Sequence, residues 1–437
     1  MLENTNLCLA SLLVLTVTAT AEDWPQFRGA KGNAVATAQT AAVRISESNT
    51  KWSTGIGGTG WSSPVVSGDR IWLTTAETFA PTPEQEARKK EGDRMAGMKT
   101  VAGRVRLRAV SVNAETGKLL HYRLLHEVTD PELIHTLNSY ASPTPAISGD
   151  HVVCHFGSYG TWCIDRNSGE TAWRNDGIVV EHSVGPGSSP IIEDGVVLLV
   201  FDGTDKQFIV GLDVRTGKEI WRTARPPIRA ADGEYRKAYS TPLIINVDGQ
   251  KQAVIPGAQW MCAYDPKTGK EIWRADTGRG FSTTPMAVYE SGLVVCSTGF
   301  MAPTMVAIDP KGTGDVTESH IAWKSRNGGS TMPTAVAHGG RVYCMDSKGI
   351  LTVLEAKTGT MLSRQRVNGK FCSSPLIVGD KLYIGDQDGR FRVYELGDSP
   401  KELAENKLGG AIMASPAMIG SDMLIRTSKA LMRVTPE

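Results

Sequence analysis

GLDVRTGKEIW (residues 211–221) and AYDPKTGKEIW (residues 263–273) are near-copies of each other, 52 positions apart. Each runs from apolar residues into an aspartate, through a Thr-Gly pair, and into an apolar run that ends in tryptophan. Glycine adopts the left-handed conformation that such a turn needs, and aspartate and threonine side chains form hydrogen bonds within the turn. Each stretch is therefore predicted to be a β-hairpin.

The hairpin recurs along the chain. A third copy spans residues 163–173, weaker copies lie at residues 113–118 and 355–360, and another begins at residue 307 with an enlarged turn before Trp323. A repeat of 40–50 residues built from strands and turns is typical of propellers and solenoids.

Eight units follow from a second pattern, an opening of two small residues, a proline and an apolar residue. The first spacing is longer than the others because residues 76–103 are inserted, and the charged stretch at residues 83–90 is predicted to form an exposed helix. The prolines of the eight openings stand at positions 64, 143, 190, 242, 285, 333, 375 and 416.

The last unit ends at Glu437 with room for three strands rather than four. The segment around Trp52 has the pattern of an outer strand with no repeat around it. If this strand completes the last blade, the open sheet edges pair and the ring closes. The sequence therefore predicts an all-β fold, an eight-bladed β-propeller of four-stranded blades over residues 46–437 whose last blade is closed by an N-terminal strand.

The chain has 47 Lys and Arg residues against 46 Asp and Glu residues. This balance excludes a dominantly electrostatic partner such as nucleic acid. Residues 1–21 combine an apolar run with Ala19-Thr20-Ala21, the pattern of a secretory signal peptide, although no basic residue precedes the run. We expect an exported monomer, periplasmic or secreted, with an N-terminal arm over residues 22–45 and no transmembrane segment after cleavage.

Six cysteines follow the predicted signal peptide. Cys154, Cys296 and Cys344 occupy the same strand position in different units, and equivalent positions in different blades are too far apart for a disulfide. We therefore predict buried free thiols. One pair stays open, because a two-residue turn at residues 158–159 would place Cys154 opposite Cys163.

The pattern Ala-x-Asp-x-x-Thr-Gly-x-x-x-Trp, complete at residues 263–273, resembles the tryptophan-docking motif of quinoprotein-type eight-bladed β-propellers. The chain also resembles the exported PQQ-like propeller proteins of planctomycete-type bacteria, which begin with the WPQFRG found here at residues 24–29. The propeller lipoprotein of the outer-membrane β-barrel assembly machine is related to them in fold. The resemblance implies tryptophans wedged between adjacent blades, namely Trp52, Trp173, Trp221, Trp273 and Trp323.

The resemblance is specific for the fold and weak for function, because the same propeller serves dehydrogenases, assembly scaffolds and sensors. PQQ-dependent dehydrogenases hold calcium by carboxylate and amide oxygens and often carry adjacent cysteines. This sequence has no adjacent cysteines. The loops that enter the inner strands offer one carboxylate, Glu181, with Asn138, Asn327 and Asn368 as amide candidates. We predict no catalytic residue, no metal site and no cofactor, and PQQ with calcium stays open as the alternative.

The same loops carry aromatic and cationic side chains that would converge on one mouth of the central channel. Such a mouth suits an anionic or aromatic small ligand, a sugar or an extended peptide. The alternative is that the aromatic rings only plug the channel. The predicted funnel residues are Trp61, Tyr140, His182, Arg236, Tyr239, Arg279, Phe281, Arg326 and Phe371.

Three functions are compatible with these residues. The favoured one is a non-catalytic binding or scaffolding protein, with a protein partner or a small anionic or aromatic ligand. A PQQ-dependent oxidoreductase is the alternative, and the missing cysteine pair and the few loop carboxylates weigh against it. A carbohydrate- or cell-wall-binding accessory protein is the third, and no residue pattern separates it from the first.

Overall fold

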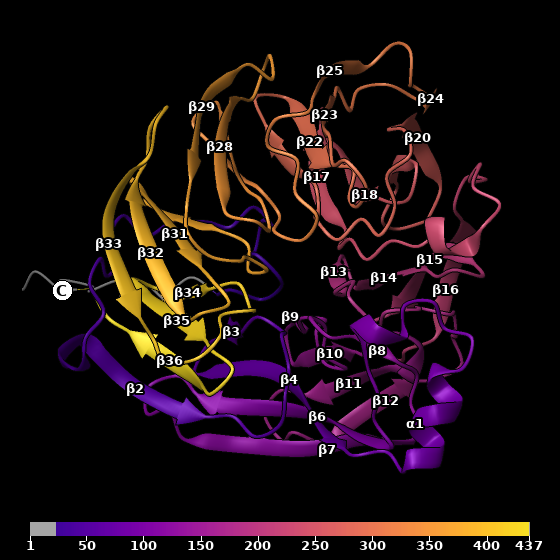
Figure 1. Cartoon of the computed structure of the whole chain (residues 1–437), viewed down its shortest axis with the longest axis vertical. Helices are drawn as coiled ribbons and strands as arrows, with labels where there is room; N and C mark the ends of the chain where they lie inside the picture. Colours follow the sequence, from indigo (N-terminus) through magenta and orange to yellow (C-terminus); the bar gives the residue numbers. More distant parts are fainter. Residues whose placement is uncertain (1–22, 437) are drawn as a thin grey trace, which may run out of the picture.

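The computed structural model describes residues 23–436, so the predicted signal peptide lies outside the described residues. Eight sheets surround a central channel and follow one another round the ring in chain order (Figure 1). Each sheet is one blade, and its first strand lies nearest the channel. The prediction of an all-β, eight-bladed propeller is confirmed.

The first four blades follow one another along the chain. Blade 1 contains β3 (Val65–Ser67), β4 (Arg70–Phe79), β6 (Arg104–Asn113) and β7 (Leu119–Thr129). Blade 2 contains β9 (Ala146–Ser148), β10 (His151–His155), β11 (Thr161–Asp165) and β12 (Thr171–Asn175). Blade 3 contains β13 (Ile191–Glu193), β14 (Val196–Asp202), β15 (Gln207–Asp213) and β16 (Glu219–Ala224). Blade 4 contains β17 (Leu243–Val247), β18 (Gln250–Pro256), β19 (Trp260–Tyr264), β20 (Glu271–Asp276) and, parallel to β20, the added β24 (Gly314–Asp315).

The other four blades complete the ring. Blade 5 contains β21 (Val288–Glu290), β22 (Leu293–Ser297), β23 (Met305–Ile308) and β25 (Ile321–Ser325). Blade 6 contains β26 (Val336–His338), β27 (Arg341–Met345), β28 (Ile350–Glu355) and β29 (Met361–Arg366). Blade 7 contains β30 (Leu376–Val378), β31 (Lys381–Gly385), β32 (Arg390–Glu395), β33 (Lys401–Lys407) and, parallel to β30, the added β1 (Val35–Ala36). Blade 8 contains β34 (Ala417–Ile419), β35 (Asp422–Arg426), β36 (Ala430–Val434) and β2 (Thr50–Gly55).

The hydrophobic core lies between neighbouring blades. One cluster of buried side chains joins Val254 and Ala263 of blade 4 to Val294 and Val306 of blade 5. Every residue of β14 is buried, because both faces of a blade pack against its neighbours. This explains why inner strands are apolar on both faces, whereas the outer strand β29 alternates between exposed and half-buried positions.

The last blade is completed from the N-terminus, as predicted. β2 pairs antiparallel with β36, and Trp52 lies opposite Arg433. Nε1 of Trp52 donates to the backbone oxygen of Ala114 in blade 1 at 2.9 Å. The strand thus joins blade 8 to blade 1 and pairs an edge that would otherwise be open.

The repeated turn has the chemistry that its sequence predicts. Oδ1 of Asp213 accepts hydrogen bonds from the N–H groups of Arg215 (3.0 Å) and Thr216 (2.9 Å). Gly217 has a φ of 67°, which favours glycine. A Cβ at position 217 would also lie 2.3 Å from the ring of Trp173 in the preceding blade. The glycine therefore serves both the turn and the contact between blades.

The tryptophans that end the repeats lie against the next blade. Nε1 of Trp173 donates to the oxygen of Val214 (2.7 Å), and Nε1 of Trp323 donates to the oxygen of Ala356 (3.0 Å). The ring of Trp221 would contact any Cβ added at Gly269, and its Nε1 has no partner among the described residues. Trp273 differs because β24 covers it, and it is fully buried with Nε1 donating to Oε1 of Gln252 (2.8 Å).

A belt of hydroxyl groups joins the blades around the channel. At seven of the eight steps a backbone N–H of one blade donates to a Ser or Thr Oγ of the next blade. In blade 5 this position is Met286, so the step from blade 4 to blade 5 has no such acceptor. The seven bonds, between 2.9 and 3.1 Å, run from Ser63 to Thr144, Thr144 to Ser189, Ser189 to Thr241, Met286 to Thr334, Thr334 to Ser374, Ser374 to Ser415 and Ser415 to Ser63.

The belt corrects the register of the repeat in three blades. The residue after each belt position is proline in six blades and alanine, Ala287 and Ala335, in blades 5 and 6. Pro143, Pro285 and Pro333, which marked their units in the sequence, lie two residues before the equivalent position. The number of units is unchanged, because each of these prolines still precedes its own inner strand.

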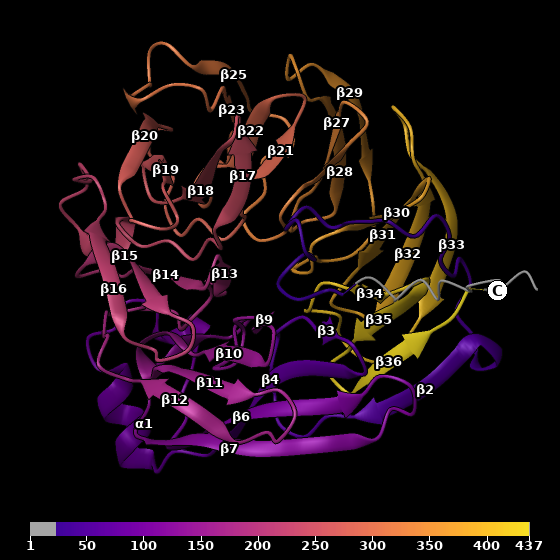
Figure 2. The same ribbon diagram turned by 180° about the vertical axis from the view of Figure 1, so that it is seen from behind.

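The N-terminal arm crosses the channel and lies against the inner strands of several blades. Trp24 bridges Val66 of blade 1, and the oxygen of Pro25 accepts from the N–H of Ile147 in blade 2. Arg28, which is buried, donates from Nη2 to the oxygen of Ala335 in blade 6 at 2.6 Å. In Figure 2 the indigo arm reaches the centre of the ring. The arm thus covers one end of the channel.

The insertion in blade 1 lies over the opposite end. It contains α1 (Pro83–Lys90), where the sequence predicts a helix, then η2 (Ala96–Met98) and β5 (Lys99–Thr100). β5 pairs with β8 (Ile134–His135), so the insertion is fixed to the loop that leads into blade 2. Thr82 caps α1, since its Oγ1 accepts from the N–H of Gln85 at 3.2 Å.

The six cysteines within residues 23–436 are free thiols, as predicted. Cys163 lies opposite Val153, and Cys154 lies opposite Trp162. The connection between β10 and β11 contains η3 (Gly157–Tyr159) instead of a two-residue turn at residues 158–159, and this shifts the register by one residue. The cross-strand pair that the sequence left open therefore does not form.

Candidate functional site

A cavity of about 690 Å³ lies at the mouth of the channel, and we call it the funnel. Phe27 of the N-terminal arm reaches it from one end, and Met95 and Met98 of the insertion reach it from the other. The loops that lead into the inner strands form its walls. Their lining side chains include Trp61, His135, Leu137, Asn138, Tyr235, Lys237, Tyr239, Phe281, Phe300, Met301, Met332, Cys372 and Met413.

Three of the nine predicted funnel residues, Trp61, Tyr239 and Phe281, lie on the funnel wall. The Tyr239 hydroxyl donates to the backbone oxygen of His182 at 2.5 Å, which fixes the position of the ring. The Phe281 ring packs edge-on against Tyr235 and Phe300, with ring centroids 4.8 and 5.8 Å away. The aromatic part of the expected mouth is thus brought together.

The other six predicted residues do not line the funnel. Tyr140, His182 and Phe371 are buried in the packing of the loops, and the Tyr140 hydroxyl donates to the oxygen of Glu132 at 2.6 Å. Arg236 donates to the backbone oxygen of Ala230 at 2.7 Å. Arg279 and Arg326 are exposed away from the cavity. The mouth therefore has an apolar character, where the sequence suggested an aromatic and cationic one.

Methionines form much of the funnel lining that the sequence did not predict. Met95, Met98, Met301, Met332 and Met413 all line the funnel. They come from the insertion and from three different loops, so no local motif groups them. Methionine side chains are flexible and polarizable, and they adapt to irregular apolar ligands.

The rim of the funnel leaves large apolar side chains in solvent. Met301 is 65% exposed, Phe300 is 52% exposed and Met98 is 50% exposed. Tyr235 and Leu137 complete this rim. Exposed apolar groups gathered around a concave cavity are a common mark of a binding surface.

One buried cation stands on the funnel wall. Lys237 is 1% exposed and forms an ion pair with Glu234, and its Nζ also lies 3.3 Å from Oγ of Ser183. The pKa of His135, also on the wall, is lowered first by burial and then by the charges of Lys237 and Lys99. A neutral imidazole keeps this part of the wall free of a second positive charge.

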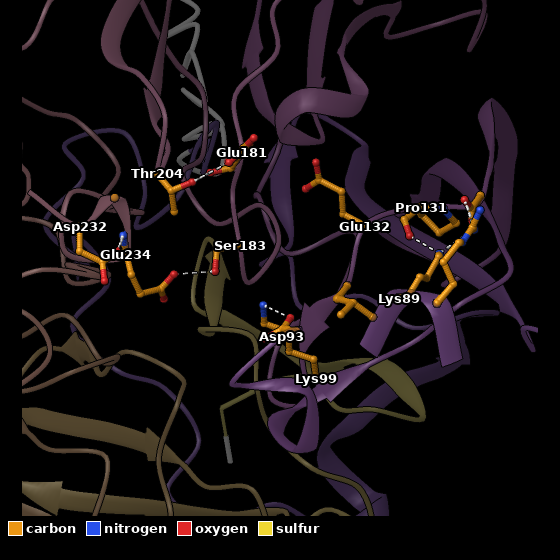
Figure 3. A pocket seen from close by; sticks show the side chains of 14 residues that line it. Lys89, Asp93, Lys99, Pro131, Glu132, Glu181, Ser183, Thr204, Asp232 and Glu234 are labelled. Atoms are coloured by element: carbon orange, nitrogen blue, oxygen red, sulfur yellow. Dashed lines mark hydrogen bonds and ion pairs between the residues drawn. The ribbon is translucent and has the colours of Figure 1, made fainter. Parts of the chain in front are cut away.

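A second cavity of about 840 Å³ shares Glu234 with the funnel, and Figure 3 shows the side chains that line this second cavity. We call it the acidic cleft. Its cations are Arg88, Lys89 and Lys99, and its carboxylates are Asp93, Asp130, Glu132, Glu181, Asp232 and Glu234.

The cations of the acidic cleft are already paired. Arg88 lies 2.6 Å and Lys89 lies 3.0 Å from carboxylate oxygens of Asp130, and Lys99 lies 2.8 Å from Asp93. Glu132, Glu181 and Asp232 have no cationic partner within the described part of the chain. The cleft thus presents uncompensated negative charge to solvent.

Glu132 shows the effect of this charge. Its pKa is raised, first by partial burial within the cleft and then by the charges of Glu181 and Asp205. The Glu181 carboxylate accepts from Oγ1 of Thr204 at 3.1 Å. Glu181, the one loop carboxylate that the sequence offered as a metal ligand, therefore lies in the acidic cleft, outside the funnel.

The funnel does not fit the PQQ–calcium pair that the fold resemblance raises. Calcium takes six to eight oxygen ligands, several of them charged. The funnel offers one carboxylate, Glu234, which already pairs with Lys237. The amide oxygen of Asn138 lies on its wall but already accepts hydrogen bonds from the N–H of Ser139 (2.8 Å) and the hydroxyl of Ser142 (2.6 Å). Most of the remaining lining is aromatic, thioether or hydroxyl.

Two segments of the sequence match a family of known proteins. Residues 88–255 and 305–399 match the family described as outer membrane protein assembly factor BamB. Over 206 residues, 46% of this chain, the sequence is 28% identical to the outer membrane protein assembly factor BamB of Legionella pneumophila (strain Paris). The chain spans about half of that relative, 49% of its length.

Solved structures share the fold. The quinohemoprotein alcohol dehydrogenase of Comamonas testosteroni aligns with a TM-score of 0.61 at 12% identity, covering 94% of this chain and 80% of its own. The computationally designed Ika8 protein aligns with a TM-score of 0.56 at 12% identity, covering 87% of this chain and 98% of its own. At such identities the likeness concerns the fold alone. Within residues 23–436, no helix is both long and apolar enough to cross a membrane.

Proposed function

Because this chain belongs to the family described as outer membrane protein assembly factor BamB, we propose that it is an exported, non-catalytic propeller that binds polypeptide partners during outer-membrane protein assembly. Residues 1–21 act as its signal peptide, and the mature chain works in the periplasm. The closed ring is a rigid support, and its loops present the binding surface.

One observation carries the proposal. The mouth of the channel is built from thioether and aromatic side chains, three of which are at least half exposed. Such a surface suits an apolar polypeptide segment, because flexible methionines repack around side chains of different shape. A quinone–calcium site would need several free carboxylates, and the funnel offers only Glu234, which pairs with Lys237.

The proposal is tested by binding. The mature chain is titrated into a fluorescently labelled outer-membrane β-barrel protein kept unfolded by dilution from denaturant, and the anisotropy is measured. We expect saturable binding that suppresses aggregation of the labelled chain. A folded soluble protein with the same label is the control, and equal binding to both, or to neither, would contradict the proposal.

A second measurement addresses the oxidoreductase alternative. The mature chain is mixed with PQQ and calcium, and dye reduction is followed with simple alcohols and sugars as substrates. We expect no reduction above background, because the funnel lacks free carboxylates to hold calcium or act as a base. Reduction that Glu181→Ala abolishes would reverse this conclusion.

A further inference from the structure

The funnel and the acidic cleft are neighbouring parts of one surface. They share Glu234, and the same four segments line both cavities. Asp93 and Lys99 face the cleft while Met95 and Met98 face the funnel. The other shared segments are residues 132–138, 181–189 and 232–241. A ligand that enters the funnel therefore lies directly beside the cleft.

The chemistry changes abruptly across the shared wall. On the funnel side, the exposed rim of Met98, Phe300 and Met301 offers apolar contact. On the other side, Glu132 and Glu181 have no cationic partner among the described residues, and like charges in a concave site favour a cation from outside. Lys237 on the wall is buried and pairs with Glu234, so it compensates that carboxylate but forms no ion pair with Glu132 or Glu181.

The size of the surface favours a chain over a single small molecule. Each cavity lies in the range of about 300–1,000 Å³ that one drug-sized ligand fills. An occupant of both must extend from one to the other. An extended polypeptide places successive side chains on opposite faces and can supply an apolar group and a cation a few residues apart.

We propose that the mouth binds an extended segment of the partner polypeptide, with an aromatic or long aliphatic side chain in the funnel and nearby lysine or arginine side chains in the acidic cleft. This inference rests on the proposed function and deepens it, because it names the binding surface and the chemistry of the segment. The apolar anchor supplies most of the affinity, as buried anchors do at other interfaces, and the charged pairs set the preference for basic segments.

The first experiment uses short labelled peptides of one length and the mature chain. One peptide carries an aromatic residue between lysines, the second replaces the lysines by glutamates, and the third replaces the aromatic residue by serine. We expect the first to bind at least about tenfold more tightly than the other two, with an affinity that falls as salt is raised. Equal affinity for the lysine and glutamate peptides would overturn the proposal.

The second experiment uses matched variants and the same peptides. The funnel variant is Phe300→Ser with Met301→Asn, and asparagine suits the φ of 63° at position 301. Its control changes Met361 to Asn and Leu362 to Ser, an adjacent exposed pair on β29 far from the mouth. We expect the funnel variant to weaken binding by about tenfold or more and the control to leave it unchanged.

The acidic cleft has its own matched pair. Glu132→Gln with Glu181→Gln removes two unpaired charges without changing shape, and Glu318→Gln removes an exposed carboxylate outside both cavities. We expect the double variant to bind the lysine peptide more weakly, with an affinity that depends less on salt, and Glu318→Gln to bind it like the unchanged protein. An unchanged salt dependence would contradict the role of the cleft.

The outcomes separate this inference from the proposed function. If the mature chain binds unfolded outer-membrane polypeptide and the funnel and cleft variants bind it equally well, the proposed function stands and the surface named here is wrong. If the wild-type chain binds no such polypeptide, the proposed function itself fails. A single-ring amine that binds as tightly as the lysine peptide would show a small-molecule site and overturn the polypeptide assignment.

Discussion

The turn glycines link local conformation to packing between blades. Gly217 has positive φ, and a Cβ there would lie within 2.3 Å of the Trp173 ring. Gly269 has the same relation to Trp221, and Gly359 has it to Trp323. Loss of one such glycine would therefore strain the turn and push the neighbouring tryptophan away. This double constraint explains why the Thr-Gly-…-Trp pattern is so regular along the chain.

Trp273 is the tryptophan whose loss should be most damaging. It is fully buried, and its Nε1 hydrogen bond to Gln252 is also buried. We expect Trp273→Ala to lower the free energy of unfolding by about 3–5 kcal/mol in chemical denaturation. Trp221→Ala is the comparison, because its ring is partly exposed and its Nε1 is unpartnered among the described residues, so its loss should be smaller. A loss below about 1 kcal/mol for Trp273→Ala would refute the packing role.

Two buried histidines should make stability depend on pH. Burial lowers the pKa of His182 from 6.5 to about 4 and that of His155 from 6.5 to about 3. A base with a lowered folded-state pKa stabilises the fold above its unfolded pKa, and this stability is lost as the pH falls below about 6.5. Each histidine contributes about 1.4 kcal/mol per pH unit between pH 6.5 and its folded pKa.

The test measures the free energy of unfolding between pH 6.5 and 5. His182→Gln should remove roughly half of the slope, because it removes one of the two buried histidines. The variant should still fold, since the glutamine oxygen can accept a hydrogen bond from the N–H of Ser158. His338→Gln, at an exposed position, should leave the slope unchanged. A wild-type slope of zero in this range would contradict the expectation.

At the scale of elements, two devices hold the inner strands. The hydroxyl belt gives seven backbone N–H groups a side-chain acceptor on the next blade. The N-terminal arm adds contacts to blades that are far apart in the chain, such as Trp24 with Val66 and Arg28 with Ala335. Arg28 is buried without an ionic partner within the described residues, and burial lowers its pKa to about 9. The arm is thus built into the ring.

Removal of one belt hydroxyl should lower the stability of the fold, because the position is buried. Ser374→Ala leaves the buried N–H of Thr334 without its acceptor. We expect a loss of about 1–3 kcal/mol, the usual range for a buried unsatisfied donor. Ser48→Ala, at an exposed position, is the control and should change stability little. A loss for Ser374→Ala no greater than for the control would show that the belt is not needed for stability.

Some elements could be predicted from sequence and others could not, for physical reasons. The hairpins and the closing strand follow from local turn chemistry and from a count of strands, so residues 211–221 and Trp52 were sufficient. The predicted register of the repeat is wrong in three blades. There Pro143, Pro285 and Pro333 resemble the prolines that mark the other units, but they lie two residues before the equivalent position. The path of the N-terminal arm and the methionine lining of the funnel depend on contacts between distant segments, and no local sequence pattern predicts them.

The whole molecule has two unlike ends. One end of the channel is covered by the N-terminal arm, and the other holds the insertion, the funnel and the acidic cleft. Because the arm crosses the channel opposite the mouth, we expect ligands to reach the funnel through the mouth. The sequence indicated aromatic side chains at this mouth but placed its charge incorrectly, since Arg236, Arg279 and Arg326 lie outside the funnel. The carboxylates of the cleft come from the insertion and from the loops that lead into blades 2, 3 and 4.

Ring closure should be essential for the solubility of the whole chain. Deletion of residues 46–56 removes β2 and leaves the edge of β36 unpaired. We expect a lower melting temperature and concentration-dependent aggregation, measured by light scattering, because an open apolar edge pairs with other chains. A deletion variant that stays monomeric with an unchanged melting temperature would contradict the closure role of β2.

The proposed function depends on the binding of polypeptide at the mouth of the channel. Hydrogen–deuterium exchange tests it most directly, by comparing the mature chain alone with the chain saturated by unfolded outer-membrane polypeptide. In the saturated chain we expect slower exchange in residues 93–99, 132–138 and 298–302 than in the chain alone, with no change in the outer strands β16 and β29. Protection confined to the outer strands or to the arm side of the ring, with none at the mouth, would contradict the account.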